Sequence, residues 1–198
     1  MKEKIRHGVI LAGGRSQRFG SDKALALYES KPLVRSVVDL VRSAGLEPCV
    51  ITEKHRDYSF LDCPIYFDRN SFRGPLAGLE RAFAVFPDEK ILVLTCDMPF
   101  LTKKNLRNLL EKNQKRAPAV LYRLHPDRFQ PFPGLYTSSL RSVLHLDDRK
   151  KNSMQEFLKS VEGILEIDTD GSAENFSNIN RPEDLLSRYM TQVILTRK

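Results

Sequence analysis

The chain has 198 residues, of which 41% are hydrophobic and 29% are charged, and its formal net charge at pH 7 is +7. This composition is too apolar for a disordered protein, and the length fits a single domain of residues 1–198 with a sizeable core. The positive charge suits a partner rich in phosphate, but it does not distinguish a nucleotide from a nucleic acid.

The first predicted strand covers residues 9–11 and leads into a loop with a glycine pair and several cations. Gly13 and Gly14 have no side chain, so their backbone N–H groups can lie close to an anion. Arg18 and Lys23 add the positive charge that a polyphosphate needs. The spacing of the glycines and the lysine matches neither a P-loop nor a dinucleotide-binding fingerprint. The loop therefore predicts a phosphate site of another kind, the alternative being a basic surface turn.

Strand-like and helix-like segments then alternate through the first half of the chain. Strands are predicted at residues 49–51, 64–67 and 91–94, and helices at residues 32–44, 76–86 and 103–115. Because the connections are short, this order predicts a parallel sheet with helices on both faces. Right-handed crossovers would place the carboxyl ends of these strands along one edge of the sheet.

Three candidate ligand-binding residues follow predicted strand ends, and we expect Gly13, Asp68 and Asp97 to converge on that edge. Asp97 comes directly after the most hydrophobic of these strands. A lone carboxylate beside phosphates favours a bound Mg²⁺, which proteins typically hold with one or two carboxylates and substrate phosphates. The alternative for Asp97 is an ordinary turn or helix-cap residue.

Residues 74–79 read GPLAGL and open a predicted helix. Gly74 and Gly78 would allow a ligand to lie close to the free N–H groups at the helix start. The alternative is that small residues are needed there for packing against the sheet. Asp68 can accept paired hydrogen bonds from the N1–H and N2 amine of guanine, or it can contact a ribose instead.

The second half of the chain is less regular. Strands are predicted at residues 120–122 and 134–136, helices near residues 140–144, at 154–161 and from 182 onward, and a last strand or frayed end at 193–195. Ser153 and Glu156 form a possible capping box for the 154–161 helix. Asn178 and Asn180 would point to the same side of an extended segment, which suits either a binding role or a turn before a helix.

The cysteines and the apolar segments indicate the cellular compartment in which the protein is expected. Cys49, Cys63 and Cys96 form no C-x-x-C pair, so the sequence supports neither a zinc site nor a thioredoxin-like motif. Two of the three lie in apolar strand-like segments and are expected to be buried thiols. The apolar run at residues 9–12 is too short for a signal peptide, and no stretch has the length of a membrane span. We therefore expect a cytoplasmic protein.

Four segments of the chain resemble the molybdenum cofactor guanylyltransferases of the MobA family, in the nucleotide-diphosphosugar-transferase-like superfamily. In chain order they read LAGGRSQRFGSDKAL, GPLAGL, CDMP and NINRPEDL, and they begin at residues 11, 74, 96 and 178. Arg181 stands where the family usually has a threonine. The resemblance implies a three-layer α/β/α fold of the nucleotide-diphosphosugar transferase type, with a mostly parallel, Rossmann-like sheet.

The resemblance also implies a reaction. GMP would pass from GTP to the terminal phosphate of molybdenum-loaded molybdopterin, and pyrophosphate would leave, with Mg²⁺ on Asp97. Residues 1–115 would bind the nucleotide and residues 116–198 the acceptor. The implied catalytic residues are Arg18, Lys23 and Asp97. The implied GTP-binding residues are Leu11, Ala12, Gly13, Gly14, Lys23, Asp68, Gly78 and Asp97, and the implied acceptor-binding residues are Asn178 and Asn180.

Other functions remain open at this point. A related nucleotidyltransferase that uses CTP or another nucleoside triphosphate, with molybdopterin or a sugar or alcohol phosphate, fits the same motifs. A nucleic-acid-binding protein is disfavoured because the chain has no tryptophan and its aromatic residues fall mostly in apolar segments. Lys23 and Asp97 argue against an inactive relative. We therefore expect small-molecule substrates and transient contacts with molybdoenzymes or cofactor-carrying proteins, but no nucleic acid or membrane partner.

Overall fold

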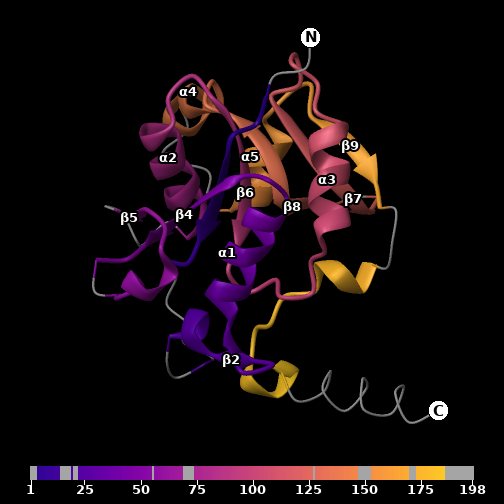
Figure 1. The fold of residues 1–198 in the computed structure, drawn as a ribbon. Coiled ribbons are helices and arrows are strands. Elements are labelled where there is room, and N and C mark those ends of the chain that lie inside the picture. Colours follow the sequence, from indigo (N-terminus) through magenta and orange to yellow (C-terminus); the bar gives the residue numbers. More distant parts are fainter. Residues whose placement is uncertain are drawn as a thin grey trace, which may run out of the picture.

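The computed structural model describes residues 4–13, 19, 22–54, 56–68, 74–126, 128–146, 153–169 and 173–185. Helices cover both faces of a central β-sheet, which gives the three layers that the sequence predicts (Figure 1). On one face lie α1 (Leu33–Ser43) and α3 (Lys103–Glu111), and on the other lie α2 (Pro75–Val85), α4 (Leu140–Leu146) and α5 (Met154–Lys159).

The main sheet has seven strands and is mixed. Their order across the sheet is β5 (Ile65–Phe67), β4 (Glu47–Thr52), β1 (His7–Leu11), β6 (Lys90–Thr95), β8 (Arg128–Thr137), β7 (Ala119–His125) and β9 (Leu165–Asp168). The first four strands run parallel to one another. β8 runs antiparallel to β6 and β7, and β9 runs parallel to β7. The predicted parallel sheet is therefore confirmed for the first half of the chain and is extended by an antiparallel strand.

Smaller elements complete the described part of the chain. They are the 3₁₀ helices η1 (Lys23–Leu25), η2 (Ser59–Leu61) and η4 (Ala173–Phe176), and a two-stranded antiparallel sheet of β2 (Leu27–Tyr28) and β3 (Lys31–Pro32). The short sheet lies beyond the carboxyl end of β1, on the lower side of the molecule in Figure 1. Within the described ranges, every helix is too short or too polar to cross a membrane.

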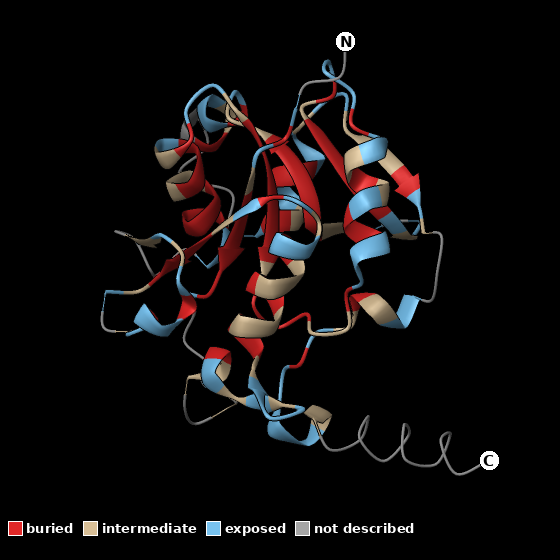
Figure 2. Cartoon of the chain, viewed as in Figure 1, coloured by how far each residue is buried: buried red, intermediate tan, exposed pale blue. Residues whose placement is uncertain are grey.

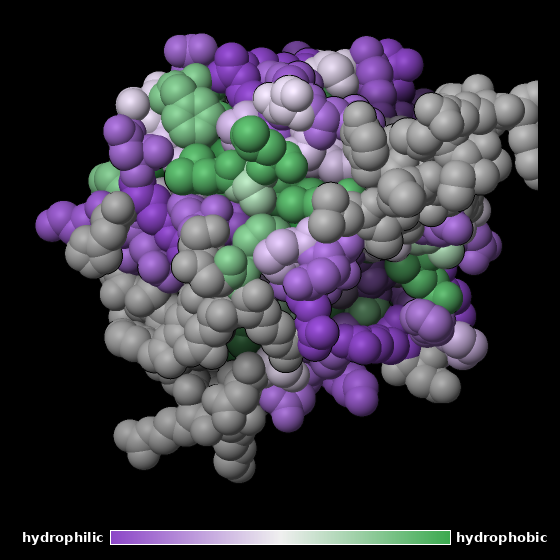
Figure 3. All heavy atoms as spheres, turned by 90° about the horizontal axis from the view of Figure 1, so that it is seen from below, coloured by the Kyte–Doolittle hydropathy of each residue, from purple (hydrophilic) through white to green (hydrophobic). Residues whose placement is uncertain are grey.

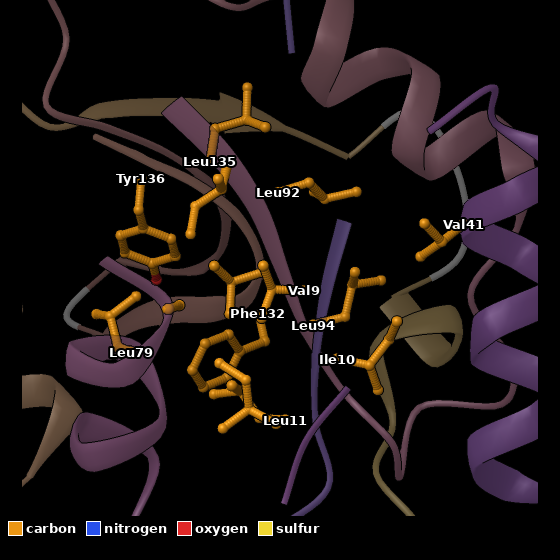
Figure 4. Packing of buried hydrophobic residues seen from close by; sticks show 14 of the residues in the cluster. Val9, Ile10, Leu11, Val41, Leu79, Leu92, Leu94, Phe132, Leu135 and Tyr136 are labelled. Carbon is orange, nitrogen blue, oxygen red and sulfur yellow. The ribbon is translucent and has the colours of Figure 1, made fainter. Parts of the chain in front are cut away.

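β1 shows how the two helical layers pack on the sheet. A Cβ atom at Gly8 would lie 2.4 Å from a methyl group of Val41, so α1 approaches the backbone of β1 as closely as glycine allows. Successive strand residues face opposite sides. Figure 4 accordingly shows Ile10 on the side of Val41 in α1 and Leu11 on the side of Leu79 in α2. Figure 2 shows the resulting buried sheet between helices whose outer sides are exposed.

The first two helices begin and end at residues that the sequence marks. α1 places five apolar side chains in the core, and it is followed by Gly45, whose φ of +83° suits glycine. α2 starts after Gly74, which has φ +60° and ψ −145°, a conformation that other residues hardly adopt. Pro75 then occupies the first helical turn. Both starts agree with the predicted helices.

α3 ends at Glu111, four residues before the predicted end at Lys115. The residues just after the helix instead bind Lys90 at the start of β6, whose side chain is buried. Its ammonium group donates to Asn113 Oδ1 at 3.0 Å and to the Gln114 carbonyl at 2.7 Å. These bonds satisfy a charge that would otherwise be buried without a partner.

The second half departs further from the prediction. β8 covers ten residues where three were predicted, and β9 was not predicted at all. Register shifts at residues 121–122 and 123–125 of β7 break the alternation that a strand prediction needs. The helix expected at 154–161 ends at Lys159, and its Ser153 cap accepts a hydrogen bond from the Glu156 N–H. The predicted strand at 193–195 lies outside the described residues.

Candidate active site

The carboxyl ends of β1, β4 and β6 border a cavity of about 150 Å³, which we call the first pocket. Gly13, Asp68 and Asp97 all line it, as the sequence analysis expected. The start of α2 forms another wall, through Gly74, Pro75 and Gly78, and the remaining lining residues are Leu11, Lys23, Ile51, Glu53, Thr95 and Cys96. Residues distant in sequence therefore meet at one edge of the sheet.

Lys23 and Asp97 form an ion pair in this pocket. The Lys23 ammonium group lies 2.7 Å from Asp97 Oδ2, and the two side chains are 18% and 12% exposed. The second carboxylate oxygen, Oδ1, is buried and has no hydrogen-bond partner among the described residues. A buried acceptor without a partner is costly for the folded protein, so this oxygen is suited to a ligand that binds in the pocket.

A hydrogen-bond network next to the pocket fixes the position of Lys23. Asp22 caps η1, and its carboxylate accepts from the Ala24 N–H, from Arg56 at 2.8 Å and from the Tyr58 hydroxyl at 2.7 Å. Arg56 also donates to the carbonyl of Ala12 at the end of β1, at 3.0 Å. The residue before Lys23 is thus tied to the segment after β4 and to β1.

The surroundings of Arg56 and Tyr58 raise the pKa values of both groups. Burial lowers the pKa of Arg56, but the Tyr58 hydrogen bond and the Asp22 charge outweigh it, so the pKa is raised above its ordinary value. Burial also raises the pKa of Tyr58 above its ordinary range. Arg56 therefore stays charged, and Tyr58 stays a hydroxyl donor throughout the neutral pH range.

Two of the glycines at the site have different structural roles. A Cβ atom at Gly78 would lie 2.9 Å from Cδ2 of Leu11, so α2 and β1 pack closely there. The packing alternative considered for Gly78 is therefore present alongside its place in the first pocket. At Gly13 a Cβ atom would meet no described atom within 4 Å. Its missing side chain leaves open space on the side where a ligand can approach.

A larger cavity of about 580 Å³, the second pocket, adjoins the first. Its walls come from β7, β8, the start of α5 and the segment around η4. Pro75, Thr95 and Asp97 line both pockets. Figure 3 looks onto the molecule from below, where hydrophilic residues border a hollow. A molecule in each pocket would meet its neighbour at these shared residues.

Asn178 and Asn180 both line the second pocket, and Ile179 between them is buried. The Ile179 N–H donates to the Asp97 carbonyl at 2.9 Å, which places this segment beside the end of β6. The carboxylate of Asp184 accepts from the N–H groups of Asn180 and Arg181, and these bonds lower the pKa of Asp184. The two asparagines thus share a side, as an extended segment predicts.

Two residues that line the site were not predicted from the sequence. Two predicted site residues lie outside the described part of the chain. Glu53 and Thr95 line the first pocket, although the sequence analysis gave neither a role. Glu53 follows β4 as Asp68 follows β5, so the strand-end rule applied to Asp68 could have found it. Gly14 and Arg18, which carry predicted roles, lie outside the described residues.

The site fits a divalent cation that is bound partly by a substrate. Within the described part of the chain, no group of three histidine, cysteine or acidic side chains could hold a metal alone. Asp97 Oδ1 offers one buried carboxylate oxygen at the boundary of both pockets. Mg²⁺ commonly binds one or two carboxylates and completes its shell with water and substrate phosphates, which agrees with this donor set.

Comparison with known proteins identifies the family. The model for the MobA-like NTP transferase domain matches residues 8–164. A protein of Carboxydothermus hydrogenoformans named "Probable molybdenum cofactor guanylyltransferase" is 32% identical over 183 residues, covering 88% of this chain and 90% of that protein. A Bacillus cereus protein with the same name is 29% identical over 185 residues, covering 89% of this chain and 92% of that protein.

The fold is found among solved structures as well. The structure of molybdopterin-guanine dinucleotide biosynthesis protein A from Archaeoglobus fulgidus superposes with a TM-score of 0.77, at 20% identity, over 97% of this chain and 100% of that one. At this identity the likeness shows the fold alone, whereas the family match extends over most of the sequence. The chain therefore belongs to the family with the MobA-like NTP transferase domain and is a nucleotidyltransferase.

Proposed function

We propose that this nucleotidyltransferase moves GMP from GTP to the terminal phosphate of molybdenum-loaded molybdopterin and releases pyrophosphate. The observation that carries the proposal is that two pockets meet at Asp97, which is paired with Lys23. A transfer between two substrates needs such a boundary, because the donor and acceptor phosphates must come into contact there. The similar proteins are named probable molybdenum cofactor guanylyltransferases, which supports a guanylyl donor and the molybdenum cofactor as acceptor.

In this proposal GTP occupies the first pocket, whose described lining residues all lie within residues 1–115. The backbone of Leu11, Ala12, Gly13 and Gly14 holds the base and the phosphates. Asp68 accepts hydrogen bonds from guanine or from the ribose, and the short distance between Gly78 and Leu11 shapes the pocket wall. Asp68→Asn is then expected to reduce GTP affinity.

In the proposed reaction, Lys23, which is paired with Asp97, acts on the triphosphate, and Arg18 is assigned the same role from the sequence. Lys23 and Arg18 neutralise the charge that grows on the leaving pyrophosphate. Mg²⁺ fits Asp97 together with substrate phosphates, and a bound divalent cation supplies Lewis-acid polarisation of phosphoryl oxygens. No side chain of the protein has to form a covalent bond, since the acceptor phosphate is itself the nucleophile.

The acceptor occupies the second pocket, most of whose lining residues lie within residues 116–198. The pocket volume of about 580 Å³ suits a molecule larger than a phosphate or a simple sugar. Asn178 and Asn180 offer amide groups to it, and Arg128 at the start of β8 offers a cation for an acceptor phosphate. Delivery of the product would need only transient contacts with molybdoenzymes or cofactor-carrying proteins.

The test is pyrophosphate release from GTP, CTP, ATP and UTP, each with and without metal-charged molybdopterin, at saturating Mg²⁺. We expect release with GTP that depends on molybdopterin, with weaker release from the other three nucleotides. Faster turnover with CTP would contradict the choice of base. Turnover that requires a sugar or alcohol phosphate and ignores molybdopterin would contradict the choice of acceptor.

A further inference from the structure

Thr95 is the last residue of β6, and its hydroxyl oxygen is buried with no hydrogen-bond partner among the described residues. Two other threonines near strand ends differ from it in this respect. The Thr52 hydroxyl at the end of β4 donates to the Ala12 carbonyl at 3.4 Å, and the Thr137 hydroxyl at the end of β8 donates to the Pro118 carbonyl at 3.2 Å. Thr95 therefore holds a polar group for which the described part of the chain provides no partner.

The position of this hydroxyl is well defined by the backbone. Thr95 pairs with Leu11 in the parallel register of β1 and β6, and the Cys96 N–H donates to the Leu11 carbonyl at 3.1 Å. Thr95 and Asp97 line both the first and the second pocket. Each carries a buried oxygen that has no hydrogen-bond partner among the residues that the structure describes, so two such groups lie at the boundary between the pockets.

We propose that the Thr95 hydroxyl donates a hydrogen bond to a non-bridging oxygen of the α-phosphoryl group during nucleotidyl transfer. This inference rests on the proposed function only in requiring that a nucleotidyl group crosses between the pockets. Of the three residues common to both pockets, Pro75 has no polar side-chain atom and Asp97 can only accept. Phosphoryl oxygens need donors, and Thr95 is the one shared described residue that offers a hydroxyl donor.

The bond changes leave Thr95 chemically unchanged. An oxygen of the acceptor phosphate attacks the α-phosphorus, and a new P–O bond forms. The bond from that phosphorus to the oxygen that bridges to the β-phosphate breaks, and its electron pair leaves on pyrophosphate. The hydroxyl keeps its proton and stabilises the non-bridging oxygens while charge redistributes in the transition state. Thr95 is then a catalytic residue by contact with the reacting group.

The experiment compares Thr95→Val, Thr95→Ser and Thr137→Val with the unchanged enzyme in the pyrophosphate-release assay. Thr95→Val keeps the side-chain shape and removes the donor, and we expect kcat to fall about 100-fold with KM for the nucleotide changed by less than about 3-fold. Thr95→Ser restores the donor and is expected to recover most of the activity. Thr137→Val is the matched control, because its hydroxyl bonds to the backbone away from both pockets.

A stability measurement separates this role from a structural one. Because the Thr95 hydroxyl has no hydrogen-bond partner within the described ranges, Thr95→Val is expected to melt at the same or a higher temperature than the unchanged protein. A lower Tm for Thr95→Val, or a kcat within 2-fold of the unchanged enzyme, would overturn the inference. An inactive Thr95→Ser with normal Tm would overturn it as well.

A binding measurement tests the contact between Thr95 and the α-phosphoryl group without the acceptor. The ³¹P resonance of the α-phosphorus in bound α,β-methylene GTP with Mg²⁺ is expected to shift in Thr95→Val and to return in Thr95→Ser. If the GTP analogue does not bind, it is replaced by the α,β-methylene analogue of whichever nucleotide releases pyrophosphate in the assay. The test of Thr95 therefore still works if the proposed base or acceptor is wrong. Identical α-phosphorus resonances in all three proteins would contradict the Thr95 contact but not the proposed function.

Discussion

Lys23 and Asp97 show how much the site depends on single residues. They come from η1 and from the turn after β6, and their ion pair lies on the wall of the first pocket. A buried ion pair of this kind adds little net stability, because desolvation of both charges offsets their attraction. Its value lies in keeping a cation beside a carboxylate where a triphosphate and a divalent cation are expected to bind.

Substitution of each partner tests this interpretation. Lys23→Ala is expected to lower kcat about 100-fold or more, because one donor to the developing charge is lost. Asp97→Ala is expected to remove the dependence of the rate on Mg²⁺ concentration. Mg²⁺ titrations of pyrophosphate release measure both effects, with Lys54→Ala as a control for a cation outside the first and second pockets. Unchanged turnover in Lys23→Ala, or a retained Mg²⁺ response in Asp97→Ala, would contradict these roles.

Part of the site was predictable from the sequence at this scale. Gly13, Asp68 and Asp97 were predictable because each follows a strand, and parallel strands bring such positions together. Thr95 was not predictable, because only the folded environment shows that its hydroxyl has no hydrogen-bond partner among the described residues. A threonine at a strand end usually bonds to nearby backbone, as Thr52 does, and the sequence alone does not distinguish the two cases.

At the scale of elements, the contact between β1 and α2 sets one wall of the first pocket. α2 lies close to the end of β1 because Gly78 presents no side chain to Leu11. The apolar periodicity predicted α1 and α2 well, since both helices bury one side against the sheet. The periodicity predicted too long an α3, because it carries no information on the hydrogen bonds that Asn113 and Gln114 accept from Lys90 of β6.

Gly78→Ala tests the link between this packing and the pocket. The added methyl group would approach the end of the Leu11 side chain to 2.9 Å, and Leu11 is expected to move into the first pocket. Nucleotide affinity should fall about 10-fold, which corresponds to about 1.4 kcal/mol. Calorimetric titration with GTP and Mg²⁺ measures the loss, and Ala84→Ser on the exposed side of α2 serves as a control. Unchanged affinity in Gly78→Ala would show that Leu11 moves away from the pocket instead.

At the scale of the whole molecule, the mixed sheet joins the two pockets. β8 inserts antiparallel between β6 and β7, and this brings the second half of the chain beside the end of β6. The sequence predicted the parallel half from alternating strands and helices. It did not predict β8 in full, because two prolines and the irregular pairing with β7 obscure the strand pattern. Burial of Cys49 and Cys96 in the core was predicted and is confirmed.

These two thiols make the stability of the molecule sensitive to alkaline pH. Burial raises the pKa of Cys49 to about 12, with a further contribution from Cys63, and burial followed by the Asp97 charge raises the pKa of Cys96 to about 12. In the unfolded chain the thiols titrate near their ordinary value of 9.0. Above that value the unfolded chain loses thiol protons that the folded protein retains. The stabilisation is therefore complete below pH 9 and is lost as the pH rises toward 12.

We accordingly expect the free energy of unfolding to fall between pH 8 and pH 10, by about 1.4 kcal/mol for each buried thiol. Urea unfolding at several pH values measures this slope. Cys49→Ala should reduce the decrease in the free energy of unfolding by the contribution of one buried thiol. Cys63→Ala, at a half-buried position, should change this decrease less. Equal slopes in Cys49→Ala and the unchanged protein would contradict the assignment.

The hydrogen bond from the Ile179 N–H to the Asp97 carbonyl has a consequence for how the enzyme can diversify. It uses main-chain atoms only, so the neighbouring asparagines can be replaced without loosening this attachment. Under the acceptor-binding role proposed for Asn178 and Asn180, substitutions at these two positions are expected to change which acceptor is recognised, while the attachment of Ile179 to Asp97 stays in place. A lineage could acquire a new second substrate in this way through a few exchanges in one short stretch of chain.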